Sequence, residues 1–254
     1  MIESIAIFSA GVWAGGINVI VGSGTLVTFP ALLLFGYPPL TANVSNNIGM
    51  VAGGVSGIYG YRSELRPNRA ILVRLAPASA AGALVGAVLL LVLPDESFKA
   101  IVPVLIVLGL LMVVFGPSVQ RRTTAPGHEG SGSTLSRVLL TAGIFALGVY
   151  GGYFGAAQGI LLVGLMGMIL SDGLQRLTAI KNVLATLVNA VAAVTFMIVA
   201  TNRIDWSVVA LISSGAFLGG YLGARYGRRL SPAVLRVLIV VIGSVALVKI
   251  LLFD

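Results

Sequence analysis

The sequence is short of charge and contains no cysteine. Charged residues make up 9% of its 254 residues, whereas a soluble domain typically carries about a quarter. Hydrophobic residues make up 57%, and the mean hydropathy is +1.04, so the chain has more apolar surface than a water-facing fold can bury. The absence of cysteine excludes disulfides and thiol chemistry. These shortages indicate a membrane protein.

Buried acids and histidines are also missing. Aspartate and glutamate occur only in loops or near the ends of apolar segments, and the single histidine, His128, lies in a polar stretch. A proton relay or a cation site made of buried carboxylates is therefore not expected. The sequence contains no nucleotide-binding, metalloprotease or serine-hydrolase motif. We predict that the protein is not an enzyme and has no catalytic residue, metal site or cofactor.

Several apolar runs approach the ~20 residues that a helix needs to cross a bilayer. The net charge of +8 comes from basic residues in the short gaps between these runs, which is the pattern of cytoplasmic loops in membrane proteins. We therefore expect an all-α polytopic membrane protein whose surroundings are the lipid bilayer, with no nucleic-acid partner. A homodimer stays open.

The chain nearly matches itself at an offset of 137 residues, which drifts to about 135 upstream, where Gly24 meets Gly159. Gly82-x-x-x-Gly86, for example, pairs with Gly219-x-x-x-Gly223, and such pairs predict close helix packing. We predict a first membrane repeat at 1–116, a polar cytoplasmic linker at 117–136 and a second repeat at 137–254. The expected apolar segments are 4–21, 24–36, 42–61, 71–93 and 98–116 in the first repeat, and 137–156, 159–171, 177–200, 205–224 and 233–252 in the second.

Basic residues assign an orientation to each repeat. They fill the gap between the third and fourth segments of the first repeat, but the gap between the fourth and fifth segments of the second. The residues are Arg62, Arg66, Arg69 and Arg74 in the former, and Arg225, Arg228, Arg229 and Arg236 in the latter. The positive-inside rule places both gaps in the cytoplasm. We therefore predict two inverted-topology repeats of about five hydrophobic segments each, with both chain ends outside.

Inversion requires an odd number of crossings per repeat. The second segment has about 13 residues and so spans only ~20 Å as a helix. Either it crosses as a short tilted helix, or the first two segments form a re-entrant hairpin. The chain would then have 8–10 membrane segments, some of them short or re-entrant.

Small residues interrupt the apolar sequence at corresponding places in both repeats. The first break is Gly22-Ser23-Gly24-Thr25, and the second contains Ala157-Gln158-Gly159. Irregular backbone at membrane depth is tolerated only inside protein or beside a watery cavity. A short helix starting at Gly24 would direct free N–H groups and the positive end of its dipole at an anion. The alternative is a tight turn between two helices, capped by Ser and Thr.

Polar side chains follow each short segment. The first repeat has Asn43, Asn46 and Asn47 near the start of its third segment, and the second has Lys181 and Asn182. Amides inside a membrane helix are costly and need partners, so they either bind substrate or join helices by hydrogen bonds. Lys181 either extends to the cytoplasmic surface or offers its charge to a bound anion.

In these stretches the sequence resembles the TauE/SafE family of sulfite-exporter-like membrane proteins. The resemblance is carried by "VGSGTLVTFPALLLFGYPPLTANVSNN", by its degenerate copy "GAAQGILLVGLMGMILSDGLQRLTAIKN" and by "NRIDWSVV", and it covers nearly the whole chain. It implies transport of a small sulfur-containing anion, such as sulfite, a sulfonate or sulfoacetate, across the bacterial inner membrane.

The residues predict a secondary transporter of a small anion that works by alternating access, and the resemblance specifies sulfur. The alternatives are a passive anion channel and a non-transporting membrane scaffold. The expected substrate-binding residues are Gly22, Ser23, Gly24, Thr25, Asn43, Asn46, Asn47, Ala157, Gln158, Gly159, Lys181 and Asn182.

Overall fold

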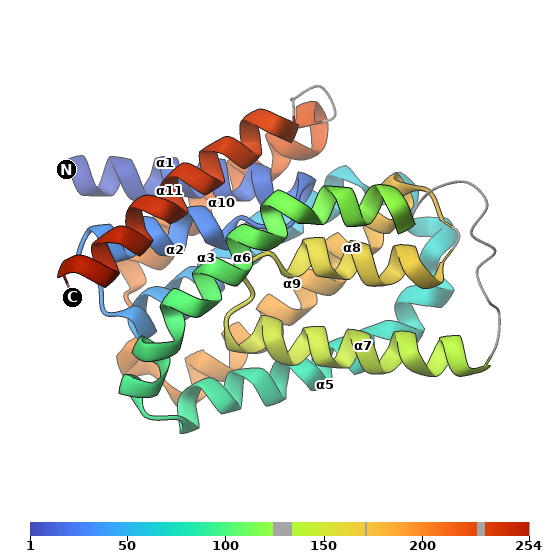
Figure 1. Ribbon diagram of the computed structural model, residues 1–254, viewed down its shortest axis with the longest axis horizontal. Coiled ribbons are helices and arrows are strands. Elements are labelled where there is room, and N and C mark those ends of the chain that lie inside the picture. Colours follow the sequence, from blue (N-terminus) through green and yellow to red (C-terminus); the bar gives the residue numbers. More distant parts are fainter. Residues whose placement is uncertain (124–133, 171, 228–231, 254) are drawn as a thin grey trace.

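A computed structural model describes residues 1–123, 134–170, 172–227 and 232–253 (Figure 1). These residues form helices and no strand, which confirms the all-α class. The first half contains α1 (Ile2–Ile20), α2 (Thr25–Leu34), α3 (Pro39–Gly60), α4 (Arg62–Leu65), the 3₁₀ turn η1 (Arg66–Asn68), α5 (Arg69–Val92) and α6 (Asp95–Thr123). The second half contains α7 (Thr134–Tyr153), α8 (Gln158–Ile169), α9 (Leu174–Val199), η2 (Thr201–Arg203), α10 (Trp206–Tyr226) and α11 (Pro232–Phe253).

Each predicted apolar segment corresponds to one long or short helix, with ends that differ by a few residues. The helices α6 and α7 extend into the predicted linker, and residues 124–133, which include His128, lie outside the described part. Arg228 and Arg229 lie outside it as well. The division into two repeats and a linker therefore stays a prediction.

Six stretches in the described residues are long and apolar enough to cross a membrane: Ile2–Ile20, Arg62–Val92, Asp95–Gly116, Thr134–Tyr153, Leu174–Val199 and Trp206–Tyr226. The helix α3 also has 22 residues, but its polar first turns lower its hydropathy. The helices α2 and α8 have only 10 and 12 residues, or about 15 and 18 Å, so neither spans a hydrocarbon core of ~30 Å.

The first two helices of each half form a hairpin. Beyond the end of α2, the Tyr37 hydroxyl donates a hydrogen bond of 2.7 Å to Glu3 near the start of α1, so α2 returns toward the end where α1 began. In the second half, a methyl group on Gly143 of α7 would meet Leu165 of α8 at 2.6 Å, as antiparallel neighbours do. The second helix of each half therefore runs antiparallel to the first. Both geometries that the sequence left open share this arrangement, so whether residues 24–36 cross the membrane or re-enter stays a prediction.

Small residues hold α1 against α10 and α5 against α7. A methyl group on Gly15 would lie 2.3 Å from the Ala216 carbonyl oxygen, and one on Gly86 would lie 2.0 Å from that of Val149. The helix backbones therefore touch, which confirms the close packing predicted from the glycine pairs.

The helix pairs follow the internal repeat. The pair α1–α10 corresponds to α5–α7, and α3–α10 corresponds to α5–α9, while α3 and α9 contact each other between the two flanking pairs. Both termini lie at one end of the bundle, and the C-terminal end of α6 and the N-terminal end of α7 lie at the other (Figure 1). The opposite membrane orientation of the two repeats stays a prediction.

Candidate functional site

The two breaks meet inside the bundle. The N–H of Gly159 donates a hydrogen bond of 3.0 Å to the Gly22 carbonyl oxygen. A methyl group on Gly22 would lie 2.5 Å from the Cα of Gly159, and a methyl group on Gly159 would lie 2.5 Å from the Cα of Gly22. Glycine is therefore required at both positions, because each backbone occupies the space of the other's side chain. Two segments far apart in the sequence thus form one buried contact.

Each hairpin turns through the same backbone geometry. Gly22 and Gly155 have φ angles of +88° and +76°, and the N–H of each donates to a carbonyl five residues earlier, at Ile17 and Tyr150 respectively. These glycines end α1 and α7 in the left-handed conformation that glycine adopts at little cost.

The matching turns also fix how the two breaks correspond. Gly22 and Gly155 lie 133 residues apart, so Gly24 corresponds to Ala157 and Thr25 to Gln158. The upstream register that paired Gly24 with Gly159 was wrong, because Gly159 belongs to the first turn of α8. It is glycine there because Gly22 packs against it.

Lys181 approaches the first break from α9. Only 1% of its surface is exposed, so of the two alternatives left open by the sequence, extension to the cytoplasmic surface was wrong. Its ammonium group donates hydrogen bonds of 2.8 and 3.0 Å to the carbonyl oxygens of Asn18 and Val19 in the last turn of α1. The last carbonyls of a helix lack intrahelical donors and carry partial negative charge. The side chain therefore turns inward, where these carbonyls accept its protons.

Asn43 makes the corresponding contact at the second break. Its amide nitrogen donates a hydrogen bond of 3.0 Å to the Tyr153 carbonyl oxygen in the last turn of α7. The third helix of each half thus provides a donor for the carbonyl end of the other half's first helix. The donor is charged in one case and neutral in the other.

Several predicted residues are committed to structural hydrogen bonds. Thr28 of α2, which the sequence had not singled out, donates to the amide oxygen of Asn46. The Gln158 amide donates a hydrogen bond of 2.8 Å to the Leu147 carbonyl oxygen within its own hairpin. The Tyr150 hydroxyl donates a hydrogen bond of 2.6 Å to the Ala156 carbonyl oxygen. Thr28 and Tyr150 are polar residues in apolar segments, and that is the signal in the sequence that distinguishes them.

Three other predicted residues carry buried polar atoms that form no hydrogen bond with any described residue. They are the Ser23 hydroxyl, the Asn47 amide oxygen and the Asn182 amide nitrogen. Asn182 follows Lys181 directly, and Ser23 follows Gly22. Gly24 and Ala157 are buried too, while Thr25 is partly exposed. Buried polar atoms without partners cost free energy and often mark functional positions.

The electrostatics at the breaks are one-sided. Among the described residues, the buried polar set contains one cation, Lys181, and no carboxylate. The helix α2 begins at Thr25, so the positive end of its dipole also lies at the first break. The Lys181 ammonium, the Ser23 hydroxyl and the Asn182 amide can all donate hydrogen bonds. This donor set suits a small acceptor-rich anion and does not suit a metal cation.

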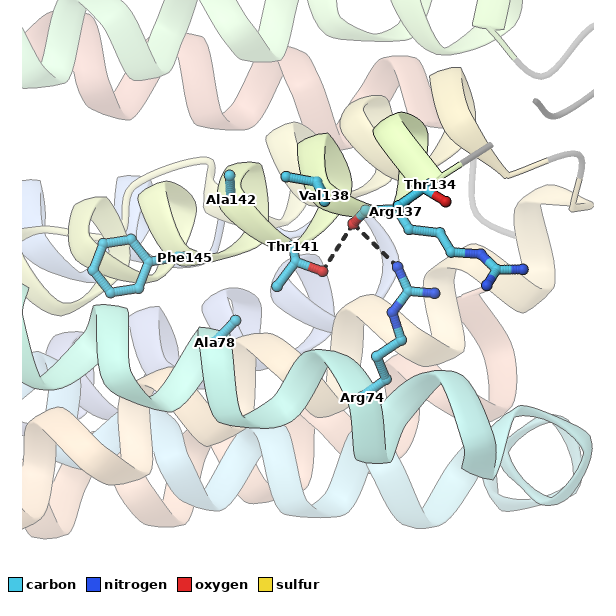
Figure 2. A pocket seen from close by; sticks show the side chains of 8 residues that line it. All are labelled: Arg74, Ala78, Thr134, Arg137, Val138, Thr141, Ala142 and Phe145. Carbon is cyan, nitrogen blue, oxygen red and sulfur yellow. Dashed lines mark hydrogen bonds between the residues drawn. The ribbon is translucent and has the colours of Figure 1, made fainter. Parts of the chain in front are cut away.

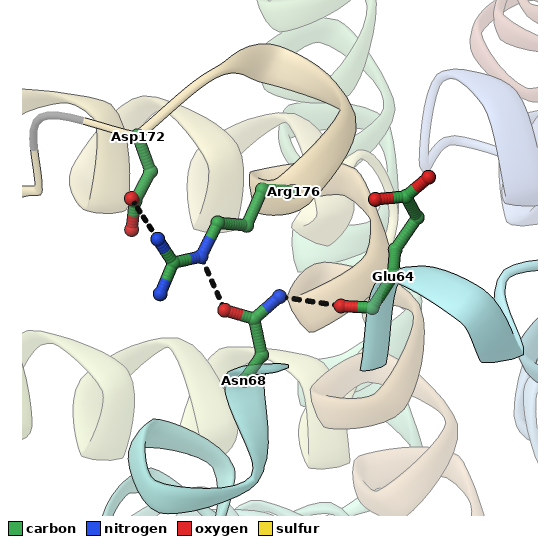
Figure 3. Close-up of polar contacts among 4 residues, drawn as sticks. All are labelled: Glu64, Asn68, Asp172 and Arg176. Atoms are coloured by element: carbon green, nitrogen blue, oxygen red, sulfur yellow. Dashed lines mark hydrogen bonds and ion pairs between the residues drawn. The ribbon is translucent and has the colours of Figure 1, made fainter. Parts of the chain in front are cut away.

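A polar network holds the start of α9 in place (Figure 3). Arg176 forms a hydrogen bond with the Asn68 side chain and an ion pair of 2.5 Å with Asp172. The Asn68 amide donates 2.5 Å to the Glu64 carbonyl oxygen. Because Arg176 lies five residues before Lys181, the network anchors the part of α9 that positions the buried ammonium.

Comparison with known proteins identifies the family of the chain. The family model described as Sulfite exporter TauE/SafE matches residues 7–250. Probable membrane transporter protein ORF9 of Sinorhizobium sp is 29% identical over 98% of this chain and 92% of its own length. A probable membrane transporter protein of Haemophilus influenzae is also 29% identical, over 98% of this chain and 94% of its own length.

Probable membrane transporter protein YfcA of Escherichia coli K12 is 25% identical over 98% of this chain and 89% of its own length. None of the solved structures matches the chain. The relatives are named as transporters, in agreement with the prediction that the protein is not an enzyme. The chain belongs to the sulfite exporter TauE/SafE family and is a multi-pass transporter protein of the bacterial membrane.

Proposed function

We propose that the protein is a secondary transporter of a small oxyanion of sulfur, bound where the two breaks meet. The observation that carries the proposal is Lys181, a fully buried cation with no carboxylate partner among the described residues. A buried charge without a counter-charge is strongly unfavourable. A bound anion would supply that counter-charge. The free energy released when the two charges pair would favour its binding.

The Lys181 ammonium and the unpaired donors of Ser23 and Asn182 support an oxyanion in particular. The ammonium has three donors and uses two of them on Asn18 and Val19, which leaves one for a ligand. The free Ser23 hydroxyl and the Asn182 amide add two more donors. A sulfur oxyanion presents several acceptor oxygens and no bulky apolar part, and the family's name specifies sulfite. The aliphatic part of the lysine lies beside Gly159, which brings the second break to the same place.

The hairpins support alternating access. The two repeats would lie inverted in the membrane, and each hairpin would enter from its own side, so that the two tips meet near the middle. The only backbone hydrogen bond described between the tips joins Gly159 and Gly22. Rocking one repeat against the other would break this contact and open the anion site to one side at a time. In this proposal the buried site would be the closed form of that cycle.

The test is sulfite uptake into proteoliposomes, measured with and without an imposed ion gradient. A secondary transporter accumulates sulfite against its own gradient when the coupling ion is supplied. A passive channel only equilibrates it. The double variant Ser23→Ala/Thr25→Val should take up sulfite more slowly while unfolding at the wild-type temperature. Unchanged uptake of every anion tested would contradict the site, and failure to accumulate under any gradient would contradict secondary transport.

A further inference from the structure

A cavity of about 690 Å³ opens on the surface of the bundle between α5 and α7, near the N-terminal ends of both helices (Figure 2). Arg74 and Arg137 lie at one end of it, and Ala78, Ala142 and Phe145 line the rest. The groove is therefore basic at one end and apolar along its length. It shares no residue with the breaks and plays no part in the transport proposal.

Its two arginines are held together and have no counter-charge among the described residues. The Arg74 guanidinium donates a hydrogen bond of 3.1 Å to the Arg137 carbonyl oxygen, which fixes the side chain of Arg74 beside the start of α7. Thr141 donates 2.9 Å to the same oxygen. Within the described residues, neither arginine forms an ion pair, and no acidic residue lines the groove. The first N–H groups of α7, at Thr134, add positive potential.

The apolar part of the groove faces outward. Val138 is 58% exposed and Phe145 is 39% exposed, on a helix apolar enough to cross the membrane. The small side chains of Ala78 and Ala142 leave room between them for a chain of methylene groups. A surface with these properties in a bilayer contacts acyl chains, and its basic end lies where a helix end meets the headgroups.

We propose that this groove is a binding site for one anionic phospholipid. The phosphate would lie between the guanidinium groups of Arg74 and Arg137, whose planar donors match phosphate oxygens. One acyl chain would follow the groove past Ala142 to Phe145. Basic pockets between transmembrane helices on the cytoplasmic side bind acidic headgroups by this combination of charge and apolar contact. A zwitterionic lipid fits the apolar part equally well, but its own cation opposes the arginine pair.

The experiment is native mass spectrometry of the full chain, purified in detergent and titrated with phosphatidylglycerol or phosphatidylcholine. Wild-type protein should retain one phosphatidylglycerol in preference to phosphatidylcholine. The double variant Arg74→Gln/Arg137→Gln should bind phosphatidylglycerol about thirtyfold more weakly, since each of the two arginines near an acidic headgroup contributes roughly 1 kcal/mol. The matched control is Arg62→Gln/Arg69→Gln, which removes two exposed arginines of the same end outside the groove and should keep wild-type binding.

A second variant distinguishes loss of the lipid site from misfolding of the protein. Ala142→Phe fills the apolar groove from an exposed position and keeps both arginines, so it should lose the lipid while remaining monodisperse with an unchanged unfolding temperature. Three results would overturn the proposal: equal affinity for the two lipids, equal loss in the control double variant, or displacement of the lipid by inorganic phosphate or sulfite. A change of oligomeric mass instead of lipid content would make the groove a contact between copies, which also contradicts it.

Discussion

The first break and the second break have the same backbone turn but opposite chemistry. At the first, a charged donor from α9, Lys181, contacts the carbonyl end of α1, and the neighbouring Ser23 hydroxyl has no partner among the described residues. At the second, a neutral donor from α3, Asn43, contacts the carbonyl end of α7, and Gln158 binds inside its own hairpin. One geometry therefore occurs once beside a buried cation with an unpaired serine hydroxyl, and once with the donors Asn43 and Gln158 both paired, although the buried Tyr153 hydroxyl there has no partner among the described residues.

The two breaks therefore have different roles, although the internal repeat makes them look alike in the sequence. A paired break stabilises the hairpin, as any tight turn in a membrane must, because unpaired backbone groups are costly there. A break with a buried cation and free donors is costly until an anion arrives. We infer that the first break, with Lys181 and Asn182, contacts the substrate, and that the second provides the rigid surface against which it closes.

The largest effect is expected where the two breaks touch. Gly22→Ala forces a side chain onto the Cα of Gly159 and keeps a φ of +88°, so it should lower the free energy of unfolding by at least about 3 kcal/mol. Gly36→Ala is the matched control, because Gly36 has a φ of +87° but nothing within 4 Å. It should cost only about 1 kcal/mol. Equal losses in reversible unfolding would show that the contact between the breaks contributes nothing.

A substitution at the second break should lower the stability of the protein without changing its affinity for substrate. Asn43→Leu keeps the side-chain volume but leaves the Tyr153 carbonyl without its donor, so the free energy of unfolding should fall by about 1–3 kcal/mol. The KM for sulfite uptake should stay at the wild-type value in the protein that folds. If the KM rises while stability is kept, then Asn43 contacts substrate and the two breaks share the same task.

Substitution of the unpaired Ser23 should change the affinity for the anion and leave the stability of the protein unchanged. Ser23→Ala removes a hydroxyl with no partner among the described residues, so stability should change by less than about 0.5 kcal/mol. The KM for the anion should rise about tenfold to a hundredfold, because a hydrogen bond to a charged group is worth about 1.5–3 kcal/mol. The control is Ser56→Ala, whose buried hydroxyl donates 2.9 Å to the Gly53 carbonyl. It should lower stability and leave the KM unchanged.

The smallest effect concerns the base of the first hairpin. Partial burial, followed by the hydrogen bond to Glu3, raises the pKa of Tyr37 from 10.0 to about 12. Because the folded-state pKa is the higher one, this contribution is fully present below pH 10 and is lost as the pH rises toward 12. Tyr37→Phe should flatten the dependence of the unfolding temperature on pH within that window. An unchanged slope would mean that another group causes it.

Sequence patterns predicted the helices well, because each apolar segment is long and is bounded by glycine, proline or charge. They also identified both breaks, since small and hydroxylated residues are conspicuous in an apolar run. They did not decide between a crossing helix and a hairpin for residues 24–36, because segment length does not reveal direction. The return of α2 along α1, which both geometries share, depends on contacts such as Tyr37 with Glu3, far apart in the sequence.

The direction of individual side chains could not be predicted from the sequence either. A lysine near the start of a membrane helix can extend to the surface or turn inward, and both readings fit the same sequence. The carbonyls of Asn18 and Val19 decide the question for Lys181, and they come from the other half of the chain. Likewise, nothing in the spacing of Arg74 and Arg137 indicated that one groove holds both.

The most direct test of the account is anion-dependent thermal unfolding of the variant Lys181→Met. Wild-type protein should unfold at a higher temperature in sulfite than in an equal concentration of a large organic anion, because bound ligand stabilises the folded state. Lys181→Met removes the uncompensated buried charge but also leaves the Asn18 and Val19 carbonyls without their donor, so its two effects on ligand-free stability oppose each other. Sulfite should no longer raise its unfolding temperature. A wild-type response to sulfite in this variant would contradict the claim that the buried ammonium binds the substrate.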